Sequence, residues 1–178
     1  MDLDRGLVRA LDRLPPRTWA GTVLRHHAPR YGALDGQGAR INGGRWNPPD
    51  SFAVVYTALE PGTIDAEFAR LTRRTGLPAR AFLPRRIAII DARLARVLDL
   101  TDAGTRRRLG VTLAQLTDDD WSRTQGIGQA AQFLGYEGVL APGADGGTTL
   151  AVFPGSLSAG SQLTVASEEA YPVSRPSE

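Results

Sequence analysis

The segment Gly36-Gln-Gly-Ala-Arg-Ile-Asn-Gly-Gly-Arg-Trp-Asn-Pro-Pro49 combines four glycines with two arginines. Glycine has no Cβ, so the backbone at these positions can approach a ligand closely. The guanidinium groups of Arg40 and Arg45 can each donate two parallel hydrogen bonds to phosphate oxygens. The segment therefore predicts a binding loop for an anionic ligand. The alternative is a surface loop of glycine and proline with scattered arginines.

Strands are expected on both sides of this segment. The β-prone residues 19–26 predict a strand before it, and the apolar run 52–58 predicts an interior strand that ends near Tyr56. The connection between them, residues 28–51, is longer than the ~15 residues usual inside a compact domain, which favours a functional loop. A Rossmann fingerprint is excluded, because Ile41 stands where the third glycine would be.

A helix is expected directly after the second strand. Pro61 suits its first turn, and Gly76 lies just beyond its end. Its apolar stripe consists of Ile64, Phe68 and Leu71. Glu67 falls between Ile64 and Leu71 on this helix, and burying a carboxylate without a partner costs several kcal/mol. Glu67 is therefore expected to have either a partner or a chemical role.

The rest of the chain predicts short helices and short strands. Further helices are expected at residues 3–14, at residues 101–110 and from Asp119 or Asp120 to Leu134. Further strands are expected at residues 87–90, 97–100, 139–141, 150–153 and 162–166. We therefore expect a mixed α/β (α+β) fold without internal repeats. Residues 1–178 are expected to form a single domain with a core at about residues 19–166 and a flexible tail at residues 168–178.

The composition excludes several kinds of site. The chain has no cysteine, and all 21 lysine or arginine positions are arginine, which excludes thiolate sites, disulfides, a P-loop and a Schiff-base lysine. Two histidines do not make a zinc cluster, and residues 118–120 lack the alternating spacing of a calcium loop, so we expect no metal. This aspartate run is expected to cap a helix.

Charge and hydropathy bear on location and partners. No stretch approaches the ~20 apolar residues that span a bilayer, and the first 14 residues lack the apolar block of a signal peptide, so we expect a cytoplasmic protein. The net charge of +2 gives no case for direct nucleic-acid binding by this chain. The pairs Arg73 with Arg74 and Arg85 with Arg86, and the run at residues 106–108, are expected on solvated faces or on a partner surface, and the alternative for each is contact with phosphates.

One family shares these motifs in the same order. The motifs are Arg25, Gly38-Ala-Arg40, Gly43-Gly-Arg-Trp-Asn-Pro48, Val55-Tyr56, Glu67, Asp119-Asp-Trp-Ser122, Gly135-Tyr-Glu-Gly-Val-Leu-Ala-Pro142 and Leu150-Ala-Val-Phe153. Over roughly residues 19–155 the chain resembles the RES domain family, named for its Arg, Glu and Ser residues. The resemblance implies a fold akin to ADP-ribosyltransferase toxins, NAD as the substrate and a cognate antitoxin that carries a DNA-binding module.

The same resemblance implies which residues form the site. Carried over by position, they are Arg25, His26, Arg45, Tyr56, Glu67 and Ser122. His26 stands where a related toxin has tyrosine. Other members place a serine after a Val-Pro or Ala-Pro pair, where this chain has Gly143, so two positions stay open for the family serine and we choose Ser122.

The charged residues of this set suit the implied reaction. Cleavage between nicotinamide and ribose passes through an oxocarbenium-like sugar, which a nearby carboxylate such as Glu67 stabilises. The alternative for Glu67 is a salt bridge to an arginine. Arg25 and Arg45 would neutralise the pyrophosphate of NAD, whereas the alternative for both is a structural ion pair with an aspartate, Asp35 or Asp65.

The aromatic residues also have two interpretations each. Tyr56 is expected to contact the nicotinamide or the ribose, or else to pack in the core. His26 and His27 are adjacent in a strand and point to opposite faces, so at most one of them lines a site. Trp46 is expected to anchor the glycine-rich segment in the core.

Together these inferences predict the toxin of a type II toxin–antitoxin system that degrades NAD. Phosphate, or else water, would accept the ADP-ribosyl group, so that NAD is the substrate, phosphate is a co-substrate and no cofactor is needed. One alternative is an ADP-ribosyltransferase that modifies a protein. Another, from a different class, is a non-catalytic module that binds a partner or nucleic acid.

Overall fold

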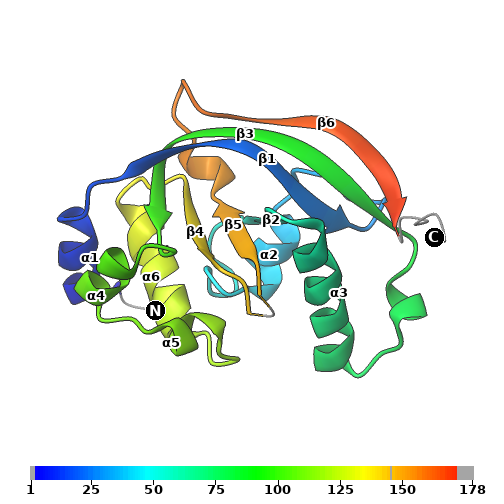
Figure 1. Cartoon of the computed structure of the whole chain (residues 1–178), viewed down its shortest axis with the longest axis horizontal. Coiled ribbons are helices and arrows are strands. Elements are labelled where there is room, and N and C mark those ends of the chain that lie inside the picture. Colours follow the sequence, from blue (N-terminus) through cyan, green and yellow to red (C-terminus); the bar gives the residue numbers. More distant parts are fainter. Residues whose placement is uncertain (1–2, 145, 172–178) are drawn as a thin grey trace.

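Three long strands arch over the rest of the molecule (Figure 1). In this computed structural model, which describes residues 3–144 and 146–171, the arch consists of β1 (Arg17–His27), β3 (Arg85–Asp99) and β6 (Gln162–Tyr171). Three shorter strands lie beneath it: β2 (Val55–Ala58), β4 (Gly138–Pro142) and β5 (Thr148–Val152). The predicted mixed α/β fold is confirmed.

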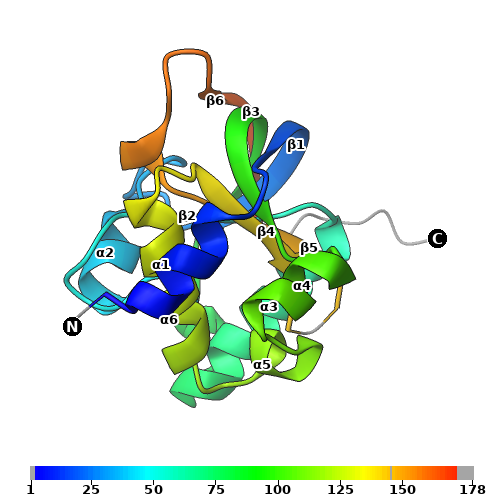
Figure 2. The ribbon, with the colours of Figure 1, turned by 90° about the vertical axis from the view of Figure 1, so that its left-hand side faces the viewer.

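The helices lie below the arch in two groups (Figures 1 and 2). Helices α1, α4, α5 and α6 gather under one end of the arch, and α3 lies under the other end. Their bounds are α1 (Arg5–Asp12), α2 (Gln37–Asn42), α3 (Pro61–Thr75), α4 (Ala103–Leu109), α5 (Leu113–Thr117) and α6 (Ser122–Phe133). Two short 3-10 helices, η1 (Ala79–Phe82) and η2 (Pro154–Ser156), complete the described elements. Within the described residues, no helix is long and apolar enough to cross a membrane.

Strand pairing closes a circuit. The order is β1-β2-β5-β4-β3-β6, and β1 also pairs with β3. The pairing of β3 with β4 is parallel, whereas the other pairings are antiparallel. The arch and the lower strands enclose an apolar cluster whose members include Val23, Ile90, Leu94, Leu150 and Val152. Because a closed circuit buries side chains on its inner face, this cluster fixes the register of the strands that reach the site.

A second apolar cluster joins the lower strands to the helices. Leu7 and Leu11 of α1 pack with Ile127 of α6 and with Tyr136, and each of these side chains is at least 95% buried. The predicted helix at residues 3–14 is confirmed, and it ends before Pro15 and Pro16. The cluster also includes Trp46, which connects the glycine-rich segment to α6.

One strand replaces two that the sequence predicted. Residues 87–90 and 97–100 do not form separate strands, because β3 runs through Arg85–Asp99 without interruption. Between the two apolar runs, Ala92 and Leu94 are buried while Asp91 and Arg93 are exposed. This period-two alternation continues the strand, and its arginine obscures the apolar signal.

The long connection is more structured than predicted. Residues 28–51 contain α2, and the strand expected at residues 52–58 begins only at Val55. Helix α5 was not expected, although Thr112 and Gln115 form a capping box at its start. Helix α6 begins at Ser122 with Trp121 at the N-cap position and no side-chain cap, so the expected capping by Asp119 or Asp120 was wrong. The Asp120 carboxylate accepts the Ser122 N–H at 2.9 Å from one residue before that position.

The C-terminal strand is longer than predicted. Strand β6 continues to Tyr171, which pairs with Arg85 of β3, so residues 168–171 do not belong to a tail. The remainder of the expected tail, residues 172–178, lies outside the described residues.

Candidate active site

The glycine-rich segment forms a short helix and a tight turn. Helix α2 ends at Gly43, whose φ of 72° favours glycine, and the Gly44 N–H then donates to the Asn47 carbonyl at 2.8 Å. The buried Asn47 side chain donates from Nδ2 to the Ala39 carbonyl at 2.7 Å. Trp46 is 1% exposed, which confirms that it anchors the segment in the core.

Tyr56 of β2 is hydrogen-bonded to this same segment. Its hydroxyl donates to Asn47 Oδ1 at 2.9 Å and accepts the Trp46 N–H at 2.9 Å. A Cβ on Gly44 would collide with that hydroxyl, so the close approach requires glycine. Burial raises the pKa of Tyr56 far above its usual value. The phenol is therefore a neutral group, and its oxygen keeps one lone pair for another donor.

Arg45 reaches from the segment toward α5. Its Nη1 donates to the carbonyls of Leu116 at 2.8 Å and Asp118 at 2.7 Å. Burial and then the positive charge of Arg70 lower the pKa of Arg45, while Glu67, Asp119 and Tyr56 act in the opposite direction. Two backbone carbonyls thus hold one arm of the guanidinium within charge range of Glu67 and Tyr56, that is, close enough to interact with them electrostatically.

One face of α3 carries Glu67 toward these groups. Ile64 and Phe68 are buried, and Glu67 lies half-buried beside them. Arg70 and Arg74, three and seven positions beyond Glu67, share its face of the helix. Arg70 forms an ion pair with Asp119, and the Arg74 guanidinium lies 3.9 Å from the centre of the Trp121 ring. Helix α3 therefore contacts the segment that joins α5 to α6.

Ser122 lies at the edge of this cluster. It is the exposed first residue of α6, and its neighbour Trp121 lies between the guanidinium groups of Arg74 and Arg45, the latter 5.7 Å from the indole centre. The alternative position for the family serine is Gly143, whose loop reaches the start of α3 at Glu60 and Thr63. Its N–H donates to the Gly147 carbonyl at 3.0 Å in the connection between β4 and β5.

The two predicted site residues on β1 belong to a separate group. Arg25 points to the same side of the strand as Val23, and its guanidinium donates to the Ala33 and Asp35 carbonyls, both at 2.6 Å. Burial lowers the pKa of Arg25, and the charge of Arg85 acts in the same direction. Among the described residues, the hydrogen bonds of the Arg25 guanidinium are therefore to two backbone carbonyls and not to the carboxylate of Asp35 or Asp65, which was the alternative to a role in binding.

His26 points to the opposite side of β1, against α3. Its ring packs edge-on against Phe68, with centroids 5.8 Å apart, and its Nδ1 accepts from Arg85 Nε at 2.8 Å. Burial, followed by the charges of Arg85 and Arg25, lowers the pKa of His26 to about 3. His27 faces away and is buried near Glu168.

The structure thus places the predicted residues in two groups, and Phe68 of α3 packs against His26 of the second group. Arg45, Tyr56 and Glu67 lie together, with Ser122 at their edge, and Arg25 and His26 lie with Arg85. Five participants were missed: Arg70, Arg74, Arg85, Asp119 and Trp121. The helical spacing from Glu67 could have indicated the first two. Arg74 is exposed, in agreement with the solvated face expected for it, and it also contacts the Trp121 ring. Arg85 had been expected on a solvated or partner surface as well, and this was wrong because its side chain is half-buried and donates to the His26 ring.

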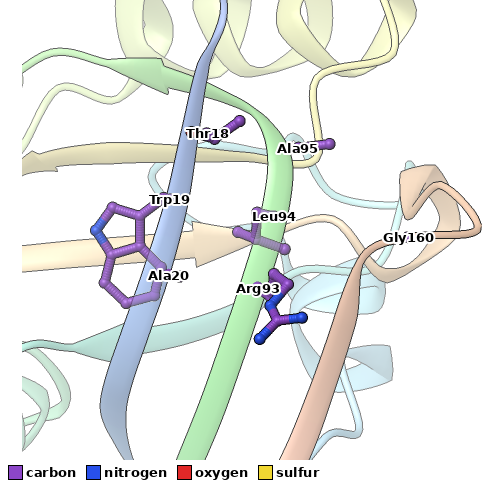
Figure 3. A pocket seen from close by; sticks show the side chains of 7 residues that line it. All are labelled: Thr18, Trp19, Ala20, Arg93, Leu94, Ala95 and Gly160. Carbon is purple, nitrogen blue, oxygen red and sulfur yellow. The ribbon is translucent and has the colours of Figure 1, made fainter.

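Two hollows of the described surface lie away from both groups. One, of about 310 Å³, is lined by residues of β1 and β3, including Trp19, Arg93 and Leu94 (Figure 3). The other, of about 740 Å³, is lined by residues of α1 and by Phe133. Neither is lined by a predicted site residue. Among residues 3–144 and 146–171, no group of three His, Cys, Asp or Glu side chains could hold a metal ion.

Known proteins resemble this chain over most of its length. The RES domain matches residues 15–174. The NAD(+) phosphorylase MbcT of Mycobacterium tuberculosis is 38% identical over 146 residues, which are 81% of this chain and 78% of that protein, and MbcT of Mycobacterium bovis matches equally well. A further M. tuberculosis protein, named Probable NAD(+) phosphorylase Rv3189, is 33% identical over 153 residues, 85% of this chain and 73% of that protein.

A solved structure matches the fold as well. The crystal structure of the M. tuberculosis MbcT–MbcA toxin–antitoxin complex contains a chain that superposes with a TM-score of 0.87 at 34% identity, covering 95% of this chain and 93% of that chain. The motifs that carry Arg45, Tyr56 and Glu67 lie inside the matched range. By domain, sequence identity and fold, this chain belongs to the RES domain family.

Proposed function

We propose that this chain is the NAD-degrading toxin of a bacterial toxin–antitoxin pair, and that it cleaves the nicotinamide–ribose bond. The observation that carries the proposal is the position of Glu67, which lies within charge range of the Arg45 guanidinium and the Tyr56 phenol. Support also comes from relatives named NAD(+) phosphorylases, whose alignments cover more than four-fifths of this chain.

The proposed reaction transfers the ADP-ribosyl group from nicotinamide to inorganic phosphate. The bond between the ribose carbon and the pyridinium nitrogen breaks, and its electron pair stays with the nitrogen. Nicotinamide therefore leaves as a neutral molecule without needing a proton. A phosphate oxygen forms the new bond to the same carbon, and the products are nicotinamide and ADP-ribose 1″-phosphate. Both bond changes pass through a sugar with oxocarbenium character.

Glu67 is the catalytic residue in this scheme. Its carboxylate stabilises the positive charge that develops on the ribose. This electrostatic stabilisation is strongest where the bound substrate has displaced water. Arg45 is held by carbonyls through Nη1, so its remaining N–H groups can donate to phosphate oxygens. Tyr56 offers its ring to the base or the ribose, and Ser122 lies at the edge where the acceptor would enter. His26 supplies a further donor for the dinucleotide, and Arg25, which lies on the opposite side of β1 and is bonded to two loop carbonyls, contributes its positive charge.

The partner is proposed to be an antitoxin. The structural neighbour was solved as a toxin–antitoxin complex, and an NAD-degrading enzyme in a cytoplasm would harm its own cell without an inhibitor. A DNA-binding module on that antitoxin is part of the same proposal, as is the cytoplasmic location.

The test is to incubate the purified chain with NAD, with and without phosphate, and to follow nicotinamide and the ribosyl product by chromatography. We expect nicotinamide and ADP-ribose 1″-phosphate in stoichiometric amounts, formed only when phosphate is present. Nicotinamide release that does not depend on phosphate would make water the acceptor. No release under either condition would contradict the enzymatic proposal and favour a binding module.

A further inference from the structure

We propose that Arg85 is a positioning residue of this site. It holds the His26 ring as the Nε2-protonated tautomer, so that His26 serves the dinucleotide as a fixed hydrogen-bond donor. Arg85 lies at the start of β3, 59 residues from His26 in sequence, and belongs to none of the motifs that define the family resemblance. The substrate part of this inference rests on the proposed function, whereas the tautomer follows from the geometry alone.

The direction of one hydrogen bond decides the tautomer. Arg85 Nε lies 2.8 Å from His26 Nδ1, and Arg85 Nη2 lies 3.3 Å from the His26 carbonyl. A guanidinium has N–H donors and no acceptor, and it stays protonated throughout the range in which proteins are folded. Nδ1 must therefore present its lone pair. A neutral imidazole carries a single ring proton, which then resides on Nε2.

The surroundings of His26 keep the ring neutral. The groups near it are Arg85 from β3 and Phe68 from α3, which contact the ring, and Arg25 and His27, which lie on the opposite side of its own strand. Three of these four are basic, and a protonated ring would also lose the bond from Arg85 Nε. Beyond Arg85 lie Tyr171 and Asp65, which are bonded to each other. His26 is therefore a donor at neutral pH and not a general acid or base.

His27 provides an internal reference with the opposite tautomer. Its Nδ1 lies 3.0 Å from the Tyr31 carbonyl and 3.2 Å from the Ala28 carbonyl. Carbonyls only accept, so Nδ1 of His27 carries the proton. Its Nε2 lies 3.7 Å from a Glu168 carboxylate oxygen and makes no hydrogen bond. The two histidines of the chain are thus expected to show reversed patterns.

The first test reads both tautomers by long-range proton–nitrogen correlation NMR at neutral pH, with His26→Gln to assign the signals. We expect a lone pair on Nδ1 of His26 and a proton on Nε2, with the reverse for His27. Arg85→Ala should convert His26 to a mixture of tautomers. Arg86→Ala is the matched control, because Arg86 is the next residue in the strand and pairs with Glu168 at 3.1 Å. A proton on Nδ1 of His26, or an unchanged spectrum in Arg85→Ala, would overturn the assignment.

The second test measures NAD binding by calorimetry in the same variants. Loss of one fixed donor should raise the Kd for NAD about 5- to 10-fold in Arg85→Ala and leave it within about 2-fold in Arg86→Ala. An unchanged Kd in Arg85→Ala would overturn the positioning role. No NAD binding by the unmodified chain would overturn the proposed function and the substrate role together, and the NMR spectra would still decide the tautomer.

Discussion

Glu137 and Glu67 are both withdrawn from solvent, fully and in part, and their surroundings differ. Glu137 is 0% exposed and accepts N–H groups from Ala95 at 2.6 Å and Ser158 at 2.9 Å, and the Ser161 hydroxyl at 2.7 Å. Burial alone would raise the pKa of Glu137, but these hydrogen bonds outweigh it and lower the pKa to about 2. Fixed, neutral donors thus hold an ionised carboxylate where β3, β4 and the turn before β6 meet.

Glu67 has a different environment. It is half-buried on α3, and the groups within its charge range include the Arg45 guanidinium and the Tyr56 phenol. A carboxylate surrounded by backbone donors has completed its bonding within the protein, and its role is to hold elements together. A carboxylate among long charged side chains can exchange interactions with a ligand. The comparison teaches that bonding partners, more than burial, separate the structural acid from the proposed catalytic acid.

Apart from replacement of Glu67 itself, the largest expected effect comes from a substitution that disturbs the surroundings of Glu67 without changing a charge. In Gly44→Ala the new Cβ would collide with the Tyr56 hydroxyl, so the tyrosine or the glycine-rich segment must shift. A displacement of about 1 Å at a reacting centre costs about 100-fold in rate, and we expect a loss of that size in kcat/KM for NAD.

Gly38→Ala is the matched control for this prediction. Gly38 lies in α2 of the same segment, and a Cβ there would meet no atom within 4 Å. Because alanine favours helix over glycine, this variant should be as stable as the parent or slightly more stable, with unchanged kcat/KM. Equal kcat/KM in Gly44→Ala and Gly38→Ala would show that the close contact between Gly44 and Tyr56 is not needed for the reaction.

How far the sequence predicted these features depends on the range of the contacts. Helix α3 was predicted with its end at Gly76, because proline, glycine and the apolar stripe are local signals. Trp46 was placed in the core correctly. In contrast, the ion pair between Arg70 and Asp119 joins residues 49 apart, and the bond between Arg85 and His26 joins residues 59 apart.

No periodicity in the sequence indicates such long-range pairs, and the same is true of the division of the predicted site residues into two groups. The sequence placed Arg25 and His26 in one pocket with Glu67, although alternation along a strand already sends adjacent side chains to opposite faces. That rule was applied to His26 and His27, and it applies equally to Arg25 and His26.

The substitution Glu137→Gln tests the structural role of the buried glutamate. The amide replaces one acceptor oxygen by a donor that faces the N–H groups of Ala95 and Ser158. Leaving buried donors without an acceptor costs about 1–3 kcal/mol, and we expect the free energy of unfolding to fall by about that amount. Urea unfolding measures this loss. Nicotinamide release at a temperature where the variant is folded should match the parent, and a catalytic defect there would contradict the division of roles.

The pH dependence of stability tests the same role of Glu137. The pKa of Glu137 is about 2 in the folded protein, below its ordinary value of 4.5, so its stabilising effect is complete above that value. The effect is lost as the pH falls from about 4.5 toward 2, because the unfolded chain binds the proton first. The stability difference between the parent and Glu137→Gln should therefore shrink over this window. A difference that stays constant would show that the carboxylate is not the stabilising species.

The smallest expected effect concerns the contact between α3 and the segment before α6. The Arg70 side chain is 15% exposed and that of Asp119 is 76% exposed, so water screens their ion pair. A double-mutant cycle with Arg70→Met and Asp119→Asn should give a coupling energy of about 0.5–1 kcal/mol in unfolding experiments. A coupling several times larger would mean that this contact, like Glu137, is a main structural support.

The most direct measurement compares nicotinamide release from NAD by Glu67→Gln and Glu137→Gln, with both variants shown to be folded by circular dichroism. Removing the charge of Glu67 should reduce kcat by about 1000-fold or more, since the developing positive charge on the sugar loses its stabilising partner. Glu137→Gln should keep the rate of the parent. If Glu67→Gln releases nicotinamide at the parent rate, the acid on α3 is not the catalytic residue.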